Sequence, residues 1–235
     1  MSPDKAKPVI AIDGTAGSGK STVARAAADA LGFTYVDTGA MYRVLTLKAV
    51  RSHTDFCGGK ALAALAARTT IELRERTGEE GEHVFLDGQD ATADIRMPDV
   101  TANVSEVSSH PEVRTGLVTH QRRIVGASAH GAVVEGRDVG TVVFPDATLK
   151  IYLDASVEVR ARRRQKDMAA AGVEVSVEEL IKLLNERDKM DSTRTTSPLK
   201  KAPDAVVVDT TDLSKAESIE AVVKLAKERL KCFSG

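Results

Sequence analysis

Eight consecutive residues near the amino terminus have the types and spacing that can hold phosphate groups. The run Gly14-Thr15-Ala16-Gly17-Ser18-Gly19-Lys20-Ser21 fits the pattern G-x-x-x-x-G-K-[ST]. Glycines let successive backbone N–H groups point inward at phosphate oxygens, and the start of a following helix adds partial positive charge. Lys20 can reach the outer phosphates of a nucleotide, and the Ser21 hydroxyl can ligate Mg²⁺. We therefore expect the segment from Gly14 to Thr22 to bind a nucleoside triphosphate with its metal ion.

The residues around this loop predict the elements that position it. Residues 9–12 form a short apolar run typical of a buried strand, and residues 22–31 are alanine-rich and free of helix breakers. Further strand-like runs, separated by helical stretches, cover residues 33–36, 132–135, 149–153 and 205–208. Buried strands that alternate with helices indicate an α/β fold, a five-stranded parallel sheet with helices on both faces. From its length of 235 residues we expect a single domain over residues 1–235.

Two helix starts are marked near the carboxyl terminus. Ser176 with Glu179, and Ser214 with Glu217, each have the spacing of a capping box. The last predicted helix, residues 219–230, has one apolar stripe and should pack on the sheet. The stripe consists of Ile219, Val222, Val223, Ala226 and Leu230.

Residues 70–102 interrupt the alternation of strands and helices. Two strand-like stretches, residues 71–74 and 83–86, are separated by a polar turn at 77–81, and an Asp87-Gly88 turn follows the second. This pattern predicts a small antiparallel insert. For its polar turn, a solvated loop is favoured over a ligand site.

Two segments with arginine directly follow predicted strands. In an open parallel sheet, ligands bind beyond the carboxyl ends of the strands, so both segments can line a site. After the second strand, Thr38 is expected to cap the next helix, and Arg43 lies on its first turns, facing the same crevice. After the third, Arg137 suits a bidentate grip on phosphate, and Asp138 can accept from an exocyclic amino group. The alternatives are a helix cap with a surface arginine, and a weak surface ion pair.

A third group of arginines lies on a predicted helix that includes residues 158–167. Helical spacing puts Arg160, Arg163 and Arg164 on adjoining faces. A small-residue stretch at 169–172 follows. Further charged residues come later: Arg187, Asp188, Asp191 and Arg194. We interpret residues 155–192 as a lid region that swings arginines over a transferring phosphoryl group, with a solvated basic face as the alternative.

The composition is that of a globular protein without a strong charge bias. Hydrophobic residues make up 42% and charged residues 29%, and the formal net charge of −1 argues against nucleic acid as the main partner. Cys57 and Cys232 match no metal-ligand spacing, which favours a reducing compartment. No apolar run is long enough for a membrane helix, and residues 1–8 lack the apolar core of a signal peptide. We expect a cytoplasmic protein with no nucleic-acid or membrane partner.

Taken together, these segments resemble the bacterial cytidylate kinases, of the nucleoside monophosphate kinase group. The resemblance runs from Val9 to the final helix, and its specific parts are residues 37–43, 136–147 and 186–194. The insert at 70–102 resembles the nucleotide-side subdomain that separates this family from adenylate and uridylate kinases. The resemblance implies a monomeric P-loop kinase that transfers the γ-phosphoryl group of ATP to CMP or dCMP with Mg²⁺.

The resemblance also implies roles for single residues. The acceptor's 5′-phosphate would be held by Thr38, Arg43 and Arg137, with Tyr42 among the substrate-binding residues. The cytosine edge would be read by Ser105, Arg114 and Asp138. The sugar would contact Arg187 and Asp191, and the phosphates would be reached by Arg194. The transferring group would be stabilised by the catalytic residues Lys20, Arg137, Arg160, Arg164 and Arg194.

Two positions depart from the pattern of the family. Ser21 stands where many relatives have threonine, although either hydroxyl can serve Mg²⁺. Glu135 stands where some relatives have aspartate, so its role toward the waters around Mg²⁺ is less defined. Two other functions stay open: a P-loop kinase for another small acceptor, such as shikimate or a different nucleotide, and an ATP-dependent switch or nucleic-acid-binding module.

Overall fold

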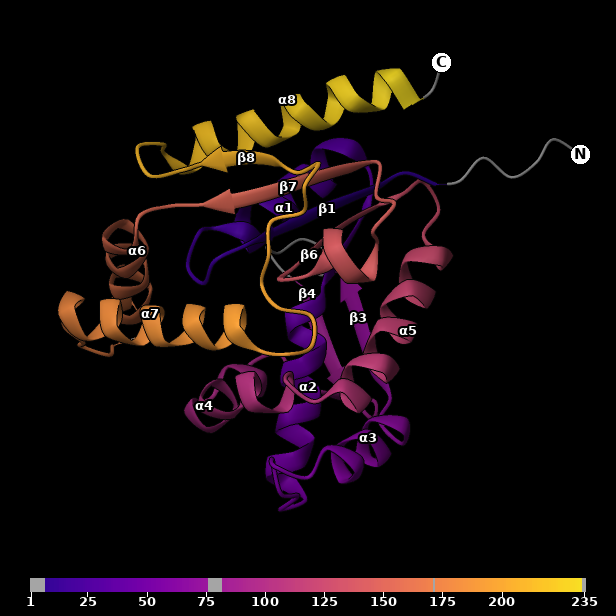
Figure 1. Ribbon diagram of the computed structural model, residues 1–235, viewed down its shortest axis with the longest axis vertical. Helices are drawn as coiled ribbons and strands as arrows, with labels where there is room; N and C mark the ends of the chain where they lie inside the picture. Colours follow the sequence, from indigo (N-terminus) through magenta and orange to yellow (C-terminus); the bar gives the residue numbers. More distant parts are fainter. Residues whose placement is uncertain (1–6, 76–81, 171, 234–235) are drawn as a thin grey trace, which may run out of the picture. The chain divides into compact units, whose positions relative to one another are not determined.

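The computed structural model describes residues 7–75, 82–170 and 172–233, and the chain divides into two compact units (Figure 1). The first, here called the sheet unit, comprises Met1–Tyr35 and Val125–Gly235. The second, the helical unit, is the continuous stretch Val36–Ile124. The expectation of a single domain with an insert at 70–102 and a lid region at 155–192 stays a prediction.

A five-stranded sheet in the order β2-β6-β1-β7-β8 confirms the predicted fold class. The strands are β1 (Val9–Gly14), β2 (Thr34–Asp37), β6 (Ala132–Gly136), β7 (Leu149–Asp154) and β8 (Val206–Asp209). β1 lies between β6 and β7 and runs parallel to both, with Ile12 opposite Glu135 on one side and Ile151 on the other. Helices flank the sheet, and Ile10 and Ile12 are fully buried. A central parallel strand is covered on both faces, which explains the continuous apolar run at residues 9–12.

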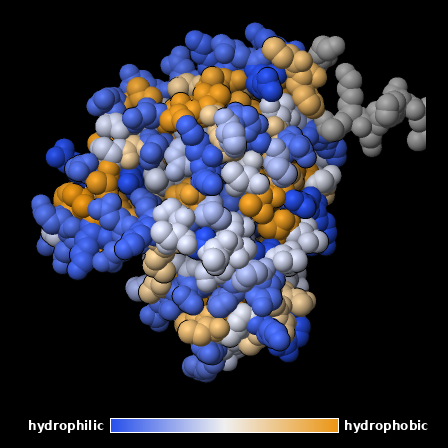
Figure 2. All heavy atoms as spheres, viewed as in Figure 1, coloured by the Kyte–Doolittle hydropathy of each residue, from blue (hydrophilic) through white to orange (hydrophobic). Residues whose placement is uncertain are grey.

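Helices α1 (Lys20–Leu31) and α8 (Lys215–Phe233) share one apolar cluster with the sheet. Val23 and Ala27 of α1 lie in this cluster with Val222 and Ala226 of α8, so the predicted stripe of the last helix does pack on the sheet. The edge strand β8 is more exposed, with Val206 at 39% and Val207 at 49% of their full exposure. Figure 2 shows apolar side chains gathered where β8 lies.

Helices α6 (Val157–Ala170) and α7 (Val177–Thr193) cover the residues for which a lid was predicted, and they pack against each other. Their small core joins Ala161, Leu180 and Leu184 to Ala16 of the phosphate loop. A separate apolar patch among hydrophilic side chains lies in Figure 2 where Figure 1 draws these two helices.

Both predicted capping boxes are confirmed. The Ser176 hydroxyl accepts from the Glu179 N–H at 3.2 Å, and the Glu179 carboxylate accepts from the Ser176 N–H at 3.2 Å. Ser214 and Glu217 make the same reciprocal pair at the start of α8, at 3.2 and 2.8 Å. Each box satisfies two backbone donors that the first turn of a helix leaves open.

The helical unit contains most of four helices and the predicted antiparallel insert. Its elements are α2 (Thr38–Arg51), α3 (Gly59–Ala67), β3 (Ile71–Glu75), β4 (Glu82–Leu86), β5 (Gln89–Asp90), a 3₁₀ turn (Asp94–Arg96), α4 (Pro98–Val107) and α5 (Pro111–Ala127), whose last turn belongs to the sheet unit. Strands β3, β4 and β5 pair antiparallel, and Asp87 and Gly88 turn the second hairpin with φ of 50° and 82°. The predicted polar turn at 77–81 lies outside the described residues.

The predicted cap of α2 was wrong by one residue. Asp37 has extended backbone angles and its carboxylate accepts from the Ala40 N–H at 3.0 Å, whereas Thr38 is already the first helical residue. Both residue types cap helices well, and the backbone conformation at Asp37 decides between them. Among the described helices, none is long and apolar enough to span a membrane.

Candidate active site

Glycine backbone geometry shapes the phosphate loop between β1 and α1. Gly14 has a φ of 153°, and a Cβ added there would lie 1.9 Å from the carbonyl oxygen of Leu153 on the neighbouring strand. Only glycine fits so close to a second backbone. Gly19 precedes α1 in the left-handed region, with a φ of 91°. The chain can therefore turn from the end of β1 directly into a helix that begins at Lys20, the geometry expected for residues 14–22.

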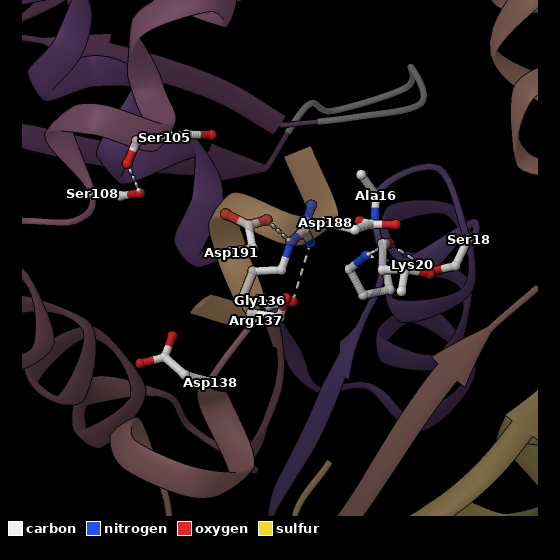
Figure 3. A network of polar contacts seen from close by, with 12 residues as sticks. Ala16, Ser18, Lys20, Ser105, Ser108, Gly136, Arg137, Asp138, Asp188 and Asp191 are labelled. Atoms are coloured by element: carbon white, nitrogen blue, oxygen red, sulfur yellow. Dashed lines mark hydrogen bonds and ion pairs between the residues drawn. The ribbon is translucent and has the colours of Figure 1, made fainter. Parts of the chain in front are cut away.

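The phosphate loop is held by side chains from distant parts of the sequence. The Thr15 hydroxyl donates to Asp154 at 2.8 Å, and the Ala16 N–H donates to Asp188 at 3.1 Å. Arg160 donates to the Ala16 carbonyl at 2.9 Å and pairs with Asp188 at 2.6 Å. Figure 3 shows Asp188 beside Ala16 and near Lys20. A charged pair from α6 and α7 thus brackets both sides of one loop residue.

The three arginines of α6 have different environments. Arg160 is 5% exposed and supports the loop; its predicted contact with the transferring group stays a prediction. Arg163 donates to the carbonyl of Thr210 at 2.7 Å and to that of Ser18 at 3.5 Å, so it ties the segment after β8 to the loop. Arg164 is exposed. Helical spacing predicted adjoining faces, and tertiary packing decides which face meets the loop.

Lys20 is a buried cation at the start of α1. Its ammonium donates to the carbonyl of Thr15 at 2.5 Å and to the hydroxyl of Ser18 at 3.4 Å. The pKa of Lys20 is lowered to about 7, mainly by burial and then by the positive charges of Arg137 and Arg187, against opposing effects of Glu135 and Asp13. Three cationic groups therefore share a region that favours the arrival of an anion.

Binding of a nucleoside triphosphate at pH 8 should take up protons. Lys20 with a pKa near 7 is mostly neutral at pH 8; added phosphate charge raises that pKa, so up to about one proton is bound. Calorimetric titrations in buffers of different ionisation enthalpy measure the uptake. Heats that do not depend on the buffer would contradict the prediction, and a Lys20→Met variant supplies the control, because it has no amine to titrate.

A second charged group follows β6, where Arg137 donates from Nε to Asp191 of α7 at 2.9 Å (Figure 3). Arg194 lies 4.0 Å from Asp191 and 3.9 Å from Asp138. Asp138 and Asp191 are 4% and 5% exposed, so these carboxylates are held among arginines and away from bulk water. The sheet unit therefore brings together Lys20, Arg137, Asp138, Arg187, Asp191 and Arg194, all predicted from the sequence.

Asp13, at the end of β1, is a further member of this group that sequence reasoning missed. Its two carboxylate oxygens accept from the N–H groups of Val139 and Gly140, each at 2.7 Å. Burial raises the pKa of Asp13 to about 6, against the lowering effect of these two backbone hydrogen bonds. The available signal was an acidic residue at the carboxyl end of a buried strand, directly before the glycine of the loop.

Glu135 is a buried, hydrogen-bonded residue of the sheet unit. Its carboxylate accepts from the hydroxyl of Tyr35, both side chains are buried, and Arg25 lies over the Tyr35 ring at 5.0 Å from its centre. Ser21, the predicted ligand of Mg²⁺, is exposed on the first turn of α1. An exposed hydroxyl next to a phosphate loop fits Mg²⁺, which binds through few protein ligands together with substrate phosphates and water.

The remaining predicted residues lie in the helical unit. Arg43 donates to the Ile95 carbonyl at 3.0 Å and to the Thr101 hydroxyl at 2.9 Å. Arg114 is 3% exposed, donates to the Ser108 carbonyl at 3.0 Å and lies over the Tyr42 ring at 5.1 Å. Thr38 is buried on the first turn of α2, and Ser105 lies on α4, where its carbonyl accepts from the Ser108 hydroxyl at 3.0 Å. This unit thus gathers polar side chains suited to phosphate and base recognition.

Comparison with known proteins gives a consistent result over nearly the whole chain. The family model described as cytidylate kinase matches residues 10–228. A cytidylate kinase of Shouchella clausii is 48% identical over 219 residues, which cover 93% of this chain and 96% of the relative. Cytidylate kinases of Caldanaerobacter subterraneus and Mycolicibacterium paratuberculosis are 46% and 48% identical, each over 94% of this chain and 96% of the relative.

Proposed function

Because the chain belongs to the cytidylate kinase family, we propose that it transfers the γ-phosphoryl group of ATP to CMP or dCMP, giving ADP and CDP or dCDP. The observation that carries this proposal is the group of charged residues beside the phosphate loop. The positive charges of Arg137 and Arg187 act on Lys20, and the side chain of Arg137 is oriented by its hydrogen bond to Asp191. Such a cluster suits two phosphorylated substrates whose negative charges must be brought together.

The acceptor's contacts are proposed residue by residue. Arg137, Thr38 and Arg43 are proposed to bind the 5′-phosphate, near Tyr42. Asp138 and Ser105 are proposed to accept from the cytosine amino group, and Arg114 to donate to the ring nitrogen and carbonyl. Uracil has a carbonyl in place of that amino group. In UMP this acceptor oxygen would face the buried Asp138 carboxylate, which is also an acceptor, so no hydrogen bond could form and UMP would be disfavoured. Arg187 and Asp191 are proposed to contact the sugar.

Phosphoryl transfer needs positioning and charge stabilisation, and little covalent chemistry. The phosphate of CMP is already anionic at neutral pH, so no general base is needed. Lys20 would hold the outer phosphates of ATP, and Arg194 would stabilise the negative charge of the phosphoryl group during transfer. Arg160 and Arg164 of the predicted lid region are proposed to stabilise the same charge. When bound at Ser21, Mg²⁺ neutralises phosphate charge. Closure of the lid region would exclude water from the reacting group.

The direct test is ADP production from Mg-ATP with CMP, dCMP, UMP, AMP and shikimate offered separately. We expect fast turnover with CMP and with dCMP, and little with UMP, AMP or shikimate. Fast turnover with one of the other acceptors would still support a kinase but would contradict the proposed cytosine contacts. ATP hydrolysis that ignores every acceptor would favour a nucleotide-dependent switch. Light scattering of the purified protein would test the proposed monomer, and cell fractionation the proposed cytoplasmic location.

The proposed role of Asp138 predicts a change in base preference. Asp138→Asn removes the carboxylate that faces the amino group and should lower kcat/KM for CMP about 100-fold, or about 2–3 kcal/mol. The loss with UMP should be much smaller, so the preference between the bases narrows. Asp146→Asn, at an exposed position of the same segment, is the matched control. An equal decrease of kcat/KM for CMP and for UMP would contradict base reading by Asp138.

A further inference from the structure

We propose that Asp13 is a positioning residue, which fixes the segment carrying Arg137 and Asp138 to the strand that leads into the phosphate loop. Its expected effect on CMP rests on the proposed function. Asp13 is not among the residues that the sequence patterns single out.

The carboxylate continues the sheet where backbone pairing stops. The pairing of β1 with β6 ends at Asp13 opposite Gly136, so Arg137 and Asp138 lie beyond the last paired residue. The next connection is made by the side chain: Oδ1 accepts from Val139 N–H and Oδ2 from Gly140 N–H, each at 2.7 Å. Both oxygens are thereby used, at a position that is 4% exposed.

The segment after β6 is closed by its own backbone hydrogen bonds, so hydrogen bonds to Val139 and Gly140 restrain its neighbouring residues as well. The Asp138 carbonyl accepts from Val142 N–H at 2.8 Å and from Val143 N–H at 3.2 Å. A Cβ added at Gly140 would lie 3.1 Å from the Lys150 side chain and 3.4 Å from Asp13 Oδ2. The turn therefore has little freedom to shift while Asp13 keeps its two hydrogen bonds.

The charged and titratable groups that act on Asp13 include Asp138 on the held segment, Lys20 on α1 and Tyr152 on β7, and the Lys150 side chain also lies close to Gly140. Asp138 favours the protonated form of Asp13, and Lys20 favours the ionised form that accepts two N–H groups. With the pKa of Asp13 near 6, the ionised form prevails at pH 8. Protonation turns one acceptor oxygen into a donor, which faces a backbone N–H.

Asp13→Asn tests the proposal with almost unchanged shape. The new amide group faces a backbone N–H, donor against donor, so one of the two hydrogen bonds is lost. At pH 8 we expect KM for CMP to rise at least about tenfold, since a misplaced binding group loses at least that much. The Kd of ATP measured without acceptor should change less than about threefold. Asp209→Asn, at the end of β8 and exposed, is the matched control and should resemble the wild type.

A second measurement needs neither CMP nor turnover. In the nucleotide-free wild type, the amide NMR signals of Val139 and Gly140 should titrate with a midpoint near pH 6, following the pKa of Asp13. In Asp13→Asn they should be displaced and lack this titration. Unchanged signals, or equal losses of ATP and CMP binding, would overturn the proposal. Because the amide signals do not depend on the acceptor, they also decide the matter if CMP proves not to be the substrate or if the variant fails to fold.

Discussion

Replacing Lys20 by methionine should lower kcat for phosphoryl transfer by about 10²–10³-fold, the usual effect of removing one preorganised charge from a transition state. Methionine keeps the length and volume of the stem and removes only the ammonium. The fold should not suffer, because burial lowers the pKa of Lys20 to about 7 and the buried cation therefore destabilises the native state below its ordinary pKa. The melting temperature at pH 7 should stay the same or rise.

Steady-state kinetics with saturating ATP and CMP measure this effect. Lys224→Met on α8 is the control, since this exposed lysine lies outside the proposed site. A Lys20→Met enzyme that keeps more than about a tenth of its kcat would contradict the proposed role, and a lower melting temperature would contradict the destabilising effect of burial.

Replacing Arg137 by methionine should raise KM for CMP about 100-fold and also weaken the fold. The proposed phosphate contact is lost, and Asp191, whose side chain is 7% exposed, loses its closest cation. Arg194 remains 4.0 Å away, so the expected loss of unfolding free energy is about 1–3 kcal/mol. Urea denaturation followed by circular dichroism measures it.

The double variant Arg137→Met/Asp191→Asn separates these two consequences. Asparagine at position 191 carries no charge, so the loss of Arg137 no longer leaves a buried carboxylate without its closest cation. Most of the unfolding free energy lost in Arg137→Met should therefore return. The affinity for CMP should not return, because the guanidinium is still missing. Recovery of both properties would mean that Arg137 acts only by stabilising the fold.

Most of the fold could be predicted from the sequence because its signals are local. The apolar run at residues 9–12, the capping box at Ser176 and the Asp87-Gly88 turn each depend on neighbours in the chain, and each is found where expected. The cap of α2 was misplaced because Asp37 and Thr38 are both good caps, and the choice depends on the backbone path out of β2.

The missed parts of the site depend on contacts between distant residues. Nothing near Asp13 in the sequence indicates that its carboxylate holds the backbone 126 and 127 positions later. Arg160 itself was singled out from the sequence, but its contacts with Asp188 of a second helix and with the Ala16 carbonyl were not. A side chain that acts on the backbone of another segment leaves no spacing pattern, so only the assembled fold identifies it.

The division of the chain has a consequence for how substrate preference can change. The helical unit is one uninterrupted stretch of sequence, Val36–Ile124, and it holds the proposed acceptor residues Thr38, Arg43, Ser105 and Arg114. The phosphate loop and the predicted lid region are both encoded outside it. A single exchange of genetic material across this stretch could therefore replace these four proposed acceptor contacts together, while the phosphate loop and the other proposed acceptor residues, among them Arg137 and Asp138, are inherited unchanged.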